Sequence, residues 1–342
     1  MTAEGSNKIF VGVDVGGTKI LSCPLRLDDQ FKVLGEEKKR TKAHKGVTGV
    51  IDRIIETVYA SLEKSSITIN DVAAVGAGVP GAVDAEKGEV IFAPNIGWKK
   101  INLKKVLENE FKVPCFVDND VNMGTFGEEK FGAGAGCRNV VGIFWGTGIG
   151  GGIIFDGKIH RGLNFTAGEI GHMILEVGGP KCGCGNKGCL EALCSRTAIS
   201  KTIFNKIKKG KSTRIKLTDE DHDTQLIKSG ALKEALLSDD KLVTGVLIAA
   251  AKDLGAGIAS IINLLCPEMV IVGGGVIESM GPELMPVIKE SAKANSFPFA
   301  QKGVKVVQAK LGDYAVLAGA AQFAKEGLLK NEAEAAQLQG KN

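Results

Sequence analysis

The alternation of apolar and polar positions along the chain predicts two successive units of strands, glycine turns and helices. The first unit begins with a buried strand at 9–15 and the second with a strand at 140–145, and each strand runs into a glycine turn. Apolar residues at helical spacing predict a helix over 46–62. The other expected strands are 20–27, 31–36, 72–79, 115–117, 153–155, 269–272 and 304–308, and the other expected helices are 103–111, 189–208, 243–265, 282–294 and 314–325.

Segments 11–18 and 141–148 are similar, because each is a strand followed by a turn of glycine and threonine. This weak internal repeat suggests two lobes of similar construction, and 342 residues are enough for two domains. Residues 206–240 are charged and irregular and are expected to form a surface insertion. Its basic residues could bind nucleic acid, but acidic residues follow at once, which favours a solvated loop. The polar tail after Glu326 is expected to fray.

The charge balance argues against nucleic acid or an anionic membrane as the main partner, because 43 basic and 39 acidic side chains leave a net charge of +4. Residues 1–8 contain no apolar signal segment. The most apolar stretch, 254–277, is interrupted by Asn263, Pro267 and Glu268, which is typical of a buried helix and strand and not of a membrane span. Eight cysteines without a signal segment indicate a reducing compartment, so a cytoplasmic location is expected.

The segment Asp14-Val-Gly-Gly-Thr-Lys19 follows a buried strand and has the composition of a phosphate-binding turn. Gly16 and Gly17 leave backbone N–H groups free to face an anion, while Thr18 adds a hydroxyl and Lys19 a positive charge. Asp14 could hold Mg²⁺ directly or through water. The alternative is a glycine hairpin whose aspartate stabilises the turn. The chain has no Gly-x-x-x-x-Gly-Lys-Ser/Thr pattern, and the dinucleotide-binding glycine spacing is not met at this strand.

A second glycine turn strengthens the phosphate interpretation. Gly146, Thr147 and Gly148 follow the strand at 140–145, and two such turns suit the several phosphates of one nucleotide. Gly274 and Gly275 follow a later strand and could lie under an adenine ring. For these two glycines the alternative is a plain strand-to-loop turn.

Short polar side chains at 118–120 follow another strand and could bind a hydroxylated ligand. Asp120 is the candidate general base that accepts a hydroxyl proton during phosphoryl transfer, with Asn119 beside it. The alternative is helix capping, and the two roles can be shared within the segment. Backbone at Gly81 could approach a ligand and Asn95 could pair with a hydroxyl, whereas Trp98 is expected in the core.

The strongest signal is a set of metal-ligand types at close spacing. Cys182, Cys184 and Cys189 lie within eight residues, and His172 precedes them, which makes a Cys₃His set typical of structural zinc. The alternative is a glycine-rich loop with free thiols. A loop fixed by the metal would present Glu169 and Glu191, together with the second ring nitrogen of His172, to neighbouring sugar hydroxyls. For both glutamates the alternative is an ordinary surface carboxylate. The remaining cysteines are expected to be small buried apolar residues.

Together these motifs resemble the ROK family, which contains bacterial sugar kinases and some transcriptional repressors. The resemblance covers about residues 9–325. It implies an actin/hexokinase-like (ribonuclease H-like), two-lobed α/β fold with a structural zinc loop, and lobe closure over a bound sugar. The small lobe would be 1–120 joined by a returning helix at about 314–327, and the large lobe 121–313. The matching positions are the segments 14–19, 80–81, 94–95, 119–120 and 146–148, with Glu169, His172, Cys182, Cys184, Cys189 and Glu191.

The resemblance implies ATP-dependent phosphorylation of a hexose, with glucose favoured, Mg²⁺ beside the nucleotide, structural Zn²⁺ and Asp120 as general base. A kinase for fructose, mannose, allose, N-acetylglucosamine or N-acetylmannosamine shares most of these motifs, and polyphosphate is a possible donor. A sugar-sensing regulator would need an N-terminal helix-turn-helix, for which no room is seen before Ile9. A non-catalytic binding protein would not need the base. A homodimer is the family expectation.

Two departures from the family pattern stand out. Asp118 occupies a position that usually holds Glu, so no sugar contact is assigned to it. Gly124, Thr125 and Gly127 lie where relatives are richer in alanine, which is expected to weaken the helix after Asp120.

Overall fold

Strand pairing produces two mixed sheets of similar topology. The computed structural model describes residues 8–339. In the first sheet the strand order is β3-β2-β1-β5-β9, with β4 also paired to β2. β1 and β2 form an antiparallel hairpin, and β1, β5 and β9 run parallel. The strands are β1 (Ile9–Val15), β2 (Lys19–Leu27), β3 (Phe31–Val33), β4 (Glu37–Arg40), β5 (Val72–Val79) and β9 (Cys115–Asn119).

The second sheet repeats this arrangement, with the order β12-β11-β10-β13-β14. β10 and β11 form an antiparallel hairpin, and β10, β13 and β14 run parallel. A hairpin followed by two parallel strands therefore occurs twice, as the similarity of segments 11–18 and 141–148 predicted. The strands are β10 (Val140–Trp145), β11 (Ile149–Phe155), β12 (Lys158–Ile159), β13 (Met269–Gly273) and β14 (Lys305–Gln308).

A small antiparallel sheet and the helices complete the described chain. The small sheet contains β6 (Ala82–Asp84), β7 (Glu89–Ala93) and β8 (Trp98–Asn102). The short 3₁₀ turns are η2 (Ala43–Lys45), η3 (Ile69–Asp71), η4 (Pro94–Ile96) and η5 (Ile170–His172). The helices are α1 (Gly46–Glu63), α2 (Leu103–Phe111), α3 (Asp120–Phe131), α4 (Leu190–Cys194), α5 (Arg196–Lys208), α6 (Asp219–Thr224), α7 (Ser229–Leu237), α8 (Lys241–Leu265), α9 (Gly275–Asn295) and α10 (Tyr314–Gln339).

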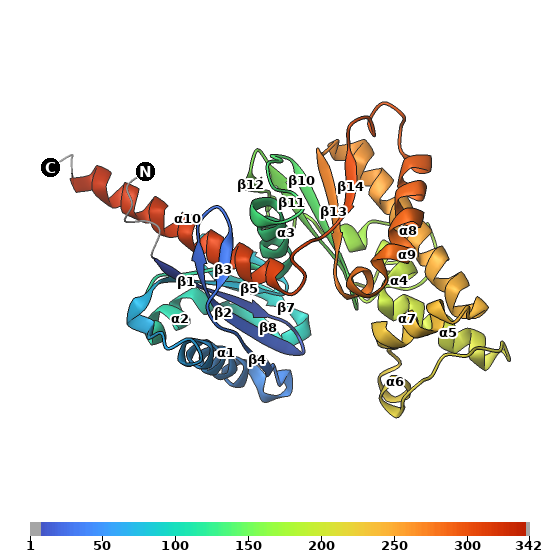
Figure 1. Ribbon diagram of the computed structural model, residues 1–342, viewed down its shortest axis with the longest axis horizontal. Coiled ribbons are helices and arrows are strands. Elements are labelled where there is room, and N and C mark those ends of the chain that lie inside the picture. Colours follow the sequence, from blue (N-terminus) through green and yellow to red (C-terminus); the bar gives the residue numbers. More distant parts are fainter. Residues whose placement is uncertain (1–7, 340–342) are drawn as a thin grey trace.

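Each large sheet has its own hydrophobic core. Val11 of β1 packs in one cluster with Ile54 of α1, and Trp98 is buried there as the sequence predicted. Val272 of β13 packs in another cluster with Leu254 of α8. Figure 1 shows the two sheets as separate layers, with α3 and α10 near the junction between them.

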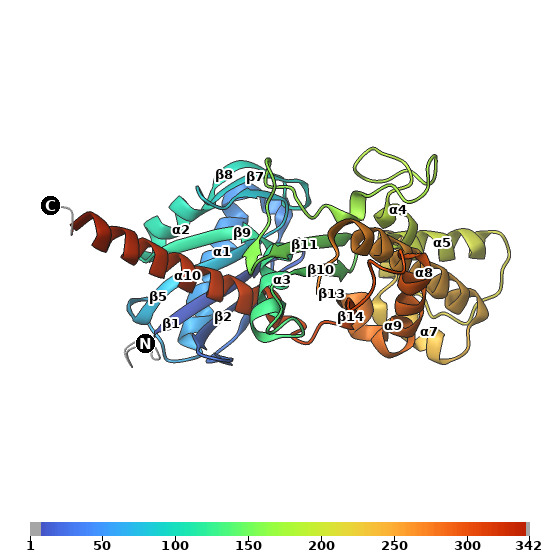
Figure 2. The ribbon, with the colours of Figure 1, turned by 90° about the horizontal axis from the view of Figure 1, so that it is seen from above.

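The last helix packs across the first sheet although it follows the second sheet in the sequence (Figures 1 and 2). Glycines make this contact possible, because a Cβ at Gly12 of β1 would clash with the carbonyl of Leu317. A Cβ at Gly76 of β5 would clash in the same way with the carbonyl of Ala320. Without side chains at these positions, the helix backbone lies directly on the sheet. The return of the last helix that the family resemblance implied is present.

The glycines of α3 also have a packing reason. A Cβ at Gly127 would clash with the carbonyl of Ala315 in α10, and one at Gly124 would lie 2.7 Å from the ring of Phe144. Gly319 of α10 meets α3 equally closely. The expected loss of intrinsic helix propensity is therefore compensated by close contact between α3, α10 and β10.

The prediction of an irregular surface insertion at 206–240 is wrong for residues 219–240 but matches residues 209–218, which form no helix or strand and are mostly exposed. This segment contains α6 and α7, and Ile227, Leu232 and Ala235 are buried in the same core as α8. Only Leu232 and Ala235 are buried in the short helix α7, and two apolar positions are a weak periodic signal when charged residues surround them.

Three element boundaries also differ from the prediction. The chain after Glu326 does not fray in the described part, because α10 continues to Gln339 through helix-favouring Ala, Leu, Glu, Gln and Lys. α9 begins at Gly275 and carries a kink at Met280, two residues before Pro282, so the prediction found only its second part. The strand expected at 153–155 is longer, since β11 begins at Ile149.

The single helix expected over 189–208 is two helices in the structure. α4 ends at Cys194, and Ser195 has extended backbone and caps α5, where its side chain accepts a hydrogen bond from the Ala198 amide. A serine that caps a new helix breaks the continuous helical pattern without changing its apolar spacing.

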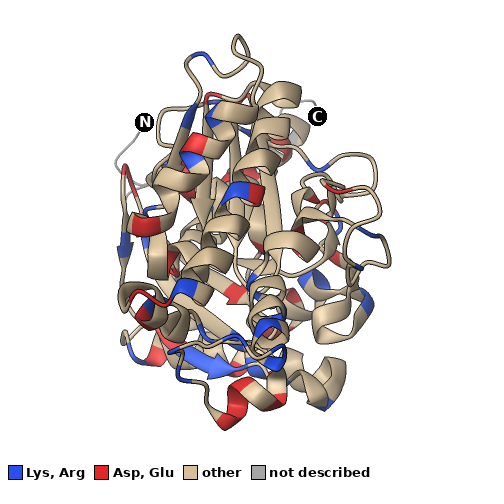
Figure 3. Ribbon diagram, turned by 90° about the vertical axis from the view of Figure 1, so that its right-hand side faces the viewer, with Lys and Arg blue, Asp and Glu red and all other residues tan. Residues whose placement is uncertain are grey.

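α8 is the one described helix long and apolar enough to cross a membrane by length and composition, but 61% of its most apolar window is buried in the protein. It packs in the core beside the second sheet, as the sequence predicted. On the side of the molecule seen in Figure 3, positively and negatively charged residues are interspersed.

Candidate active site

The predicted site residues lie mainly at the carboxyl ends of parallel strands. β1 leads to the first glycine turn, β5 ends just before Gly81, and β9 ends at Asn119. In the second sheet, β10 leads to Gly146 and β13 to Gly274. Because parallel strands end at the same edge of a sheet, each sheet collects its own set of these residues.

The first turn has two backbone amides that donate to no group among the described residues. The Gly16 amide donates to the carbonyl of Lys19 at 2.9 Å, which closes the turn. Thr41 holds it from the side, because its Oγ1 donates to the carbonyl of Gly16 at 2.6 Å. Within residues 8–339 the amides of Gly17 and Thr18 have no hydrogen-bond acceptor. Consecutive free amides of this kind form a concave anion site.

The second turn has the same property. The Gly146 amide donates to the carbonyl of Gly148 at 2.9 Å, and no described residue accepts from the amides of Thr147 and Gly148. Gly274, with φ 87°, lies against this turn, because a Cβ there would come within 2.7 Å of the Trp145 carbonyl oxygen. The structure therefore brings the predicted adenosine glycine next to the second phosphate turn.

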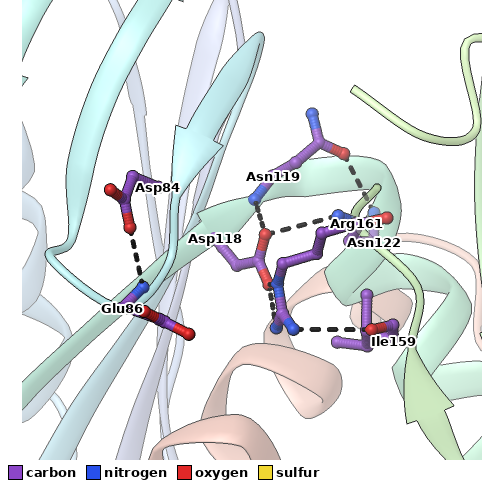
Figure 4. Close-up of polar contacts among 7 residues, drawn as sticks. All are labelled: Asp84, Glu86, Asp118, Asn119, Asn122, Ile159 and Arg161. Atoms are coloured by element: carbon purple, nitrogen blue, oxygen red, sulfur yellow. Dashed lines mark hydrogen bonds and ion pairs between the residues drawn. The ribbon is translucent and has the colours of Figure 1, made fainter. Parts of the chain in front are cut away.

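The segment after β9 divides its roles among neighbouring residues. Asn119 caps α3 by accepting from the Asn122 amide at 3.0 Å, and its Nδ2 donates to the Gly81 carbonyl at 3.0 Å. Asp118 is buried and accepts a hydrogen bond from Nε of Arg161 at 2.8 Å (Figure 4). Asp120 is the first residue of α3. Capping therefore belongs to Asn119, and Asp118 forms an ion pair.

Asp120 occupies an unusual electrostatic position. Burial raises its pKa to about 6, and the nearby charge of Glu169 contributes in the same direction. Burial likewise raises the pKa of Asp14 to about 7, with further contributions from Asp120 and from Asp313. The charge of Asp120 thus acts on Asp14 of the first turn, and the charge of Glu169 in the cysteine-rich region acts on Asp120. Carboxyl groups with raised pKa values are typical of catalytic acids and bases.

Sequence reasoning missed several charged residues near this site. Asp313 accepts a hydrogen bond from Lys19 Nζ at 2.8 Å. Burial raises the pKa of Glu278 in α9, and the charge of Asp313 raises it further while that of Lys19 opposes the rise. Arg161, which holds Asp118, was missed as well. These residues stand in no motif and are far from their partners in the sequence, so no local signal marks them.

His172, Cys182, Cys184 and Cys189 form one cluster. Their ligand atoms all lie within 4.8 Å of one another. The Sγ atoms of Cys184 and Cys189 are 3.7 Å apart, as are Cys182 Sγ and His172 Nδ1. Tetrahedral zinc with sulfur ligands at about 2.3 Å requires sulfur–sulfur separations of about 3.8 Å. The geometry and the donor set therefore fit a closed zinc site.

The two glutamates beside this cluster differ in their contacts. Glu191 accepts from the Ile149 amide at 2.9 Å, so it holds the start of β11. Glu169 is exposed, and its Oε2 lies 3.8 Å from Nε2 of His172. The histidine therefore faces the cysteines with Nδ1 and the glutamate with Nε2, as the predicted link between metal and ligand requires.

Asn95 is exposed in η4 and makes no side-chain hydrogen bond within the described residues. It lies near the first turn, because a Cβ at Gly17 would be 3.8 Å from its carbonyl oxygen. Gly275 is the first residue of α9 and follows Gly274, which lies against the end of β10 beside the second turn. The sequence-predicted residues thus form one group around Asp120 and a second around Gly146.

The fold is a two-lobed α/β architecture of the actin/hexokinase-like kind. The chain belongs to the ROK family, whose model matches residues 10–327. It is 34% identical to a glucokinase of Halalkalibacterium halodurans, over 94% of this chain and 96% of that protein. It is also 30% identical to a xylose repressor of Caldicellulosiruptor bescii, over 84% of this chain and 71% of the repressor.

Solved structures agree with this assignment. The crystal structure of a ROK family glucokinase from Streptomyces griseus, in complex with glucose and AMPPNP, is similar with a TM-score of 0.81 and 33% identity. The similarity covers 93% of this chain and 99% of that one.

Proposed function

We propose that this protein is a sugar kinase that transfers a phosphoryl group from ATP to a hexose, with glucose as the favoured acceptor. The observation that carries the proposal is the position of Asp120 at the start of α3, where its charge acts on Asp14 beside the first turn and the charge of Glu169 beside the cysteine cluster acts on it. A group between a phosphate turn and a hydroxyl-binding carboxylate is where a kinase base is needed. Glucose and ATP are supported by the similar glucokinases and by the similar structure with glucose and AMPPNP.

Two groups of residues bind the substrates in this proposal. The free amides of both turns and the ammonium of Lys19 receive the phosphates, and the glycines before α9 face the adenosine. The nucleotide residues are Asp14, Gly16, Gly17, Thr18, Lys19, Gly146, Thr147, Gly148, Gly274 and Gly275. The sugar residues are Gly81, Asn95, Asn119, Asp120, Glu169, His172 and Glu191.

Asp120 would act as the general base. The sugar hydroxyl oxygen attacks the γ-phosphorus, the bond from that phosphorus to the β-phosphate oxygen breaks, and the hydroxyl proton passes to Asp120. The raised pKa makes this carboxylate a stronger base than a solvated one while it stays ionised at neutral pH. Asp14 would hold Mg²⁺, which when bound neutralises charge on the phosphates.

The zinc cluster would be structural, because its four protein ligands leave no open position. Its effect is to fix η5 and the loop to Cys189, and with them the orientation of Glu169 and the Nε2 atom of His172. Bound sugar would therefore be recognised by groups that are fixed before it arrives.

Closure of two lobes would exclude water from the reaction. The proposed small lobe is 1–120 with the last helix at about 314–327, and the large lobe is 121–313. A homodimer, a cytoplasmic location and the absence of nucleic-acid binding stay predictions from the sequence and the family resemblance.

The test is phosphorylation of a hexose panel with ATP and Mg²⁺, measured as kcat/KM for glucose, mannose, fructose, allose, N-acetylglucosamine and N-acetylmannosamine. We expect the highest value for glucose. A preference for another sugar would keep the reaction and replace the acceptor. No turnover with any sugar, with either ATP or polyphosphate as donor, would overturn the proposal and favour a regulatory role like that of the similar xylose repressor.

A further inference from the structure

The start of α5 is attached to the second glycine turn. The Arg196 amide donates to the Gly146 carbonyl at 3.0 Å, and the Thr197 amide donates to the Thr147 carbonyl at 3.3 Å. Thr197 Oγ1 donates to the same carbonyl at 2.8 Å. The helix thus holds the carbonyl groups of the turn, while the Thr147 and Gly148 amides have no acceptor in residues 8–339.

The side chain of Arg196 brings a positive charge to this turn. Its Nη2 donates to Thr147 Oγ1 at 2.7 Å. Among the described residues it forms no ion pair, and its Nε is buried without a hydrogen-bond partner. Burial lowers the pKa of Arg196, but an arginine side chain stays protonated in proteins.

A partly buried Arg196 guanidinium without a counter-charge is energetically unfavourable unless an anion binds beside it. A partly buried guanidinium usually pairs with a carboxylate, because desolvation penalises an uncompensated charge. A purely structural link to the turn does not need the charge, since Thr197 already provides one amide and one hydroxyl bond to the same turn. An unpaired cation beside two free amides has the chemistry of a phosphate site.

We propose that Arg196 is a phosphate-binding residue for the donor nucleotide. The inference rests on the proposed function, since it assigns the second turn to the phosphates of ATP. The guanidinium contacts non-bridging oxygens of the phosphate chain, and Thr147 keeps it oriented in the absence of nucleotide. As the bond to the γ-phosphorus breaks, negative charge grows on the leaving phosphates, and the fixed guanidinium stabilises it.

The experiment compares Arg196→Gln, Arg196→Lys and Thr197→Val with the wild type. Arg196→Gln keeps a donor for Thr147 but removes the charge, Arg196→Lys keeps the charge, and Thr197→Val removes a neutral bond to the turn. Two kinds of quantity are measured: the binding constant Kd of AMPPNP with Mg²⁺ by calorimetry, and the steady-state constants kcat and KM for each substrate. Thermal unfolding identifies any variant that does not fold.

We expect Arg196→Gln to weaken AMPPNP binding by about tenfold or more and to lower kcat, with the KM for sugar nearly unchanged. Arg196→Lys should recover part of the loss, and Thr197→Val should show a smaller effect. An AMPPNP Kd within twofold of the wild type for Arg196→Gln would overturn the inference, as would an equal loss in Thr197→Val.

The binding measurement separates this inference from the proposed function. If the wild type phosphorylates no sugar but Arg196→Gln still weakens AMPPNP binding, the kinase proposal fails and the phosphate role of Arg196 stands. If the wild type is an active kinase and Arg196→Gln changes neither quantity, the kinase proposal stands and the role of Arg196 fails. If Arg196→Gln does not fold, Arg196→Lys is compared with the wild type instead. A phosphate contact that needs the planar N–H donors of the guanidinium predicts a measurable loss of AMPPNP affinity in Arg196→Lys.

Discussion

Arg161 and Asp118 join the segment after β12 to the end of β9. Nε of Arg161 donates to Oδ2 of Asp118 at 2.8 Å, and Nη2 donates to the same oxygen. The carboxylate is only 1% exposed and also accepts from Nδ2 of Asn122 at 3.3 Å. Figure 4 shows the guanidinium between Asp118 and the carbonyl of Ile159. The ion pair therefore fixes the residue next to segment 119–120, the proposed catalytic segment, and the start of the chain that leads to Glu169.

Arg161→Met is predicted to lower the free energy of unfolding by about 3 kcal/mol, because it leaves a buried carboxylate without its cation. The double variant Asp118→Asn/Arg161→Met should be less destabilised than Arg161→Met alone, since it removes both charges. Urea unfolding measures both effects. Arg138→Met is the matched control, because the Arg138–Asp156 pair is exposed and should contribute less than about 1 kcal/mol. Equal losses in Arg161→Met and Arg138→Met would contradict the prediction.

Asp120→Asn is predicted to reduce kcat by about 10²-fold or more, because the amide cannot accept the hydroxyl proton. Sugar binding should persist, since Asn retains hydrogen-bonding capacity at the start of α3. Steady-state kinetics and direct sugar titration test the two parts. A near-normal kcat would show that Asp120 is not the base.

The wild-type kcat/KM is predicted to fall as the pH drops from about 7 to about 6, the pKa values of Asp14 and Asp120. A general base must be ionised to accept a proton, so activity is lost on the acid side of its pKa and retained above it. The profile of kcat/KM against pH between about 4.5 and 8 reports this ionisation in the free enzyme. An acid limb that lies near pH 4, where an unperturbed aspartate titrates, would exclude the raised pKa.

The protein is predicted to contain about one zinc ion per chain, held by His172, Cys182, Cys184 and Cys189. Elemental analysis should show this stoichiometry, and Cys182→Ser should reduce the metal content and the melting temperature. Cys266→Ser is the control, because this cysteine is exposed and outside the cluster. Active protein without metal would remove the zinc assignment.

Glu128 holds the connection from the second sheet to α10. Its buried carboxylate accepts from the amides of Lys310 at 2.8 Å and Leu311 at 2.7 Å, and from Ala133 at 2.8 Å. Glu128→Gln replaces one acceptor oxygen with a donor, so at least one of these partly buried backbone amides loses its acceptor. We predict a loss of about 1–3 kcal/mol in the free energy of unfolding.

The neighbouring Glu129→Gln serves as the control for Glu128→Gln. Glu129 is also buried, but burial raises its pKa, and its Oε2 lies 3.3 Å from Nζ of the adjacent Lys130, so it holds no distant segment of the chain. Its replacement should change stability by less than about 1 kcal/mol. Chemical denaturation of both variants measures the difference, and a larger loss in Glu129→Gln would refute the assigned role of Glu128.

The sequence alone determined the features that depend on neighbours along the chain. The glycine turns at 16–19 and 146–148, the Cys₃His spacing and most strands were recognisable, because the residues that create them are adjacent or periodic. Predicted helix boundaries were wrong where capping and apolar periodicity give different signals, as at Ser195, which caps a new helix inside a continuous helical pattern.

Only the tertiary structure decided which distant residues meet. Arg161 and Asp118 are 43 positions apart, Arg196 and Thr147 are 49 apart, and Glu128 and Lys310 are 182 apart. No periodicity or short motif marks such pairs, because they depend on how two sheets and the returning α10 place their ends. The chemistry of the individual turns therefore follows from local sequence, whereas their assembly around Asp120 follows from the packing of strands and helices that are remote in the chain.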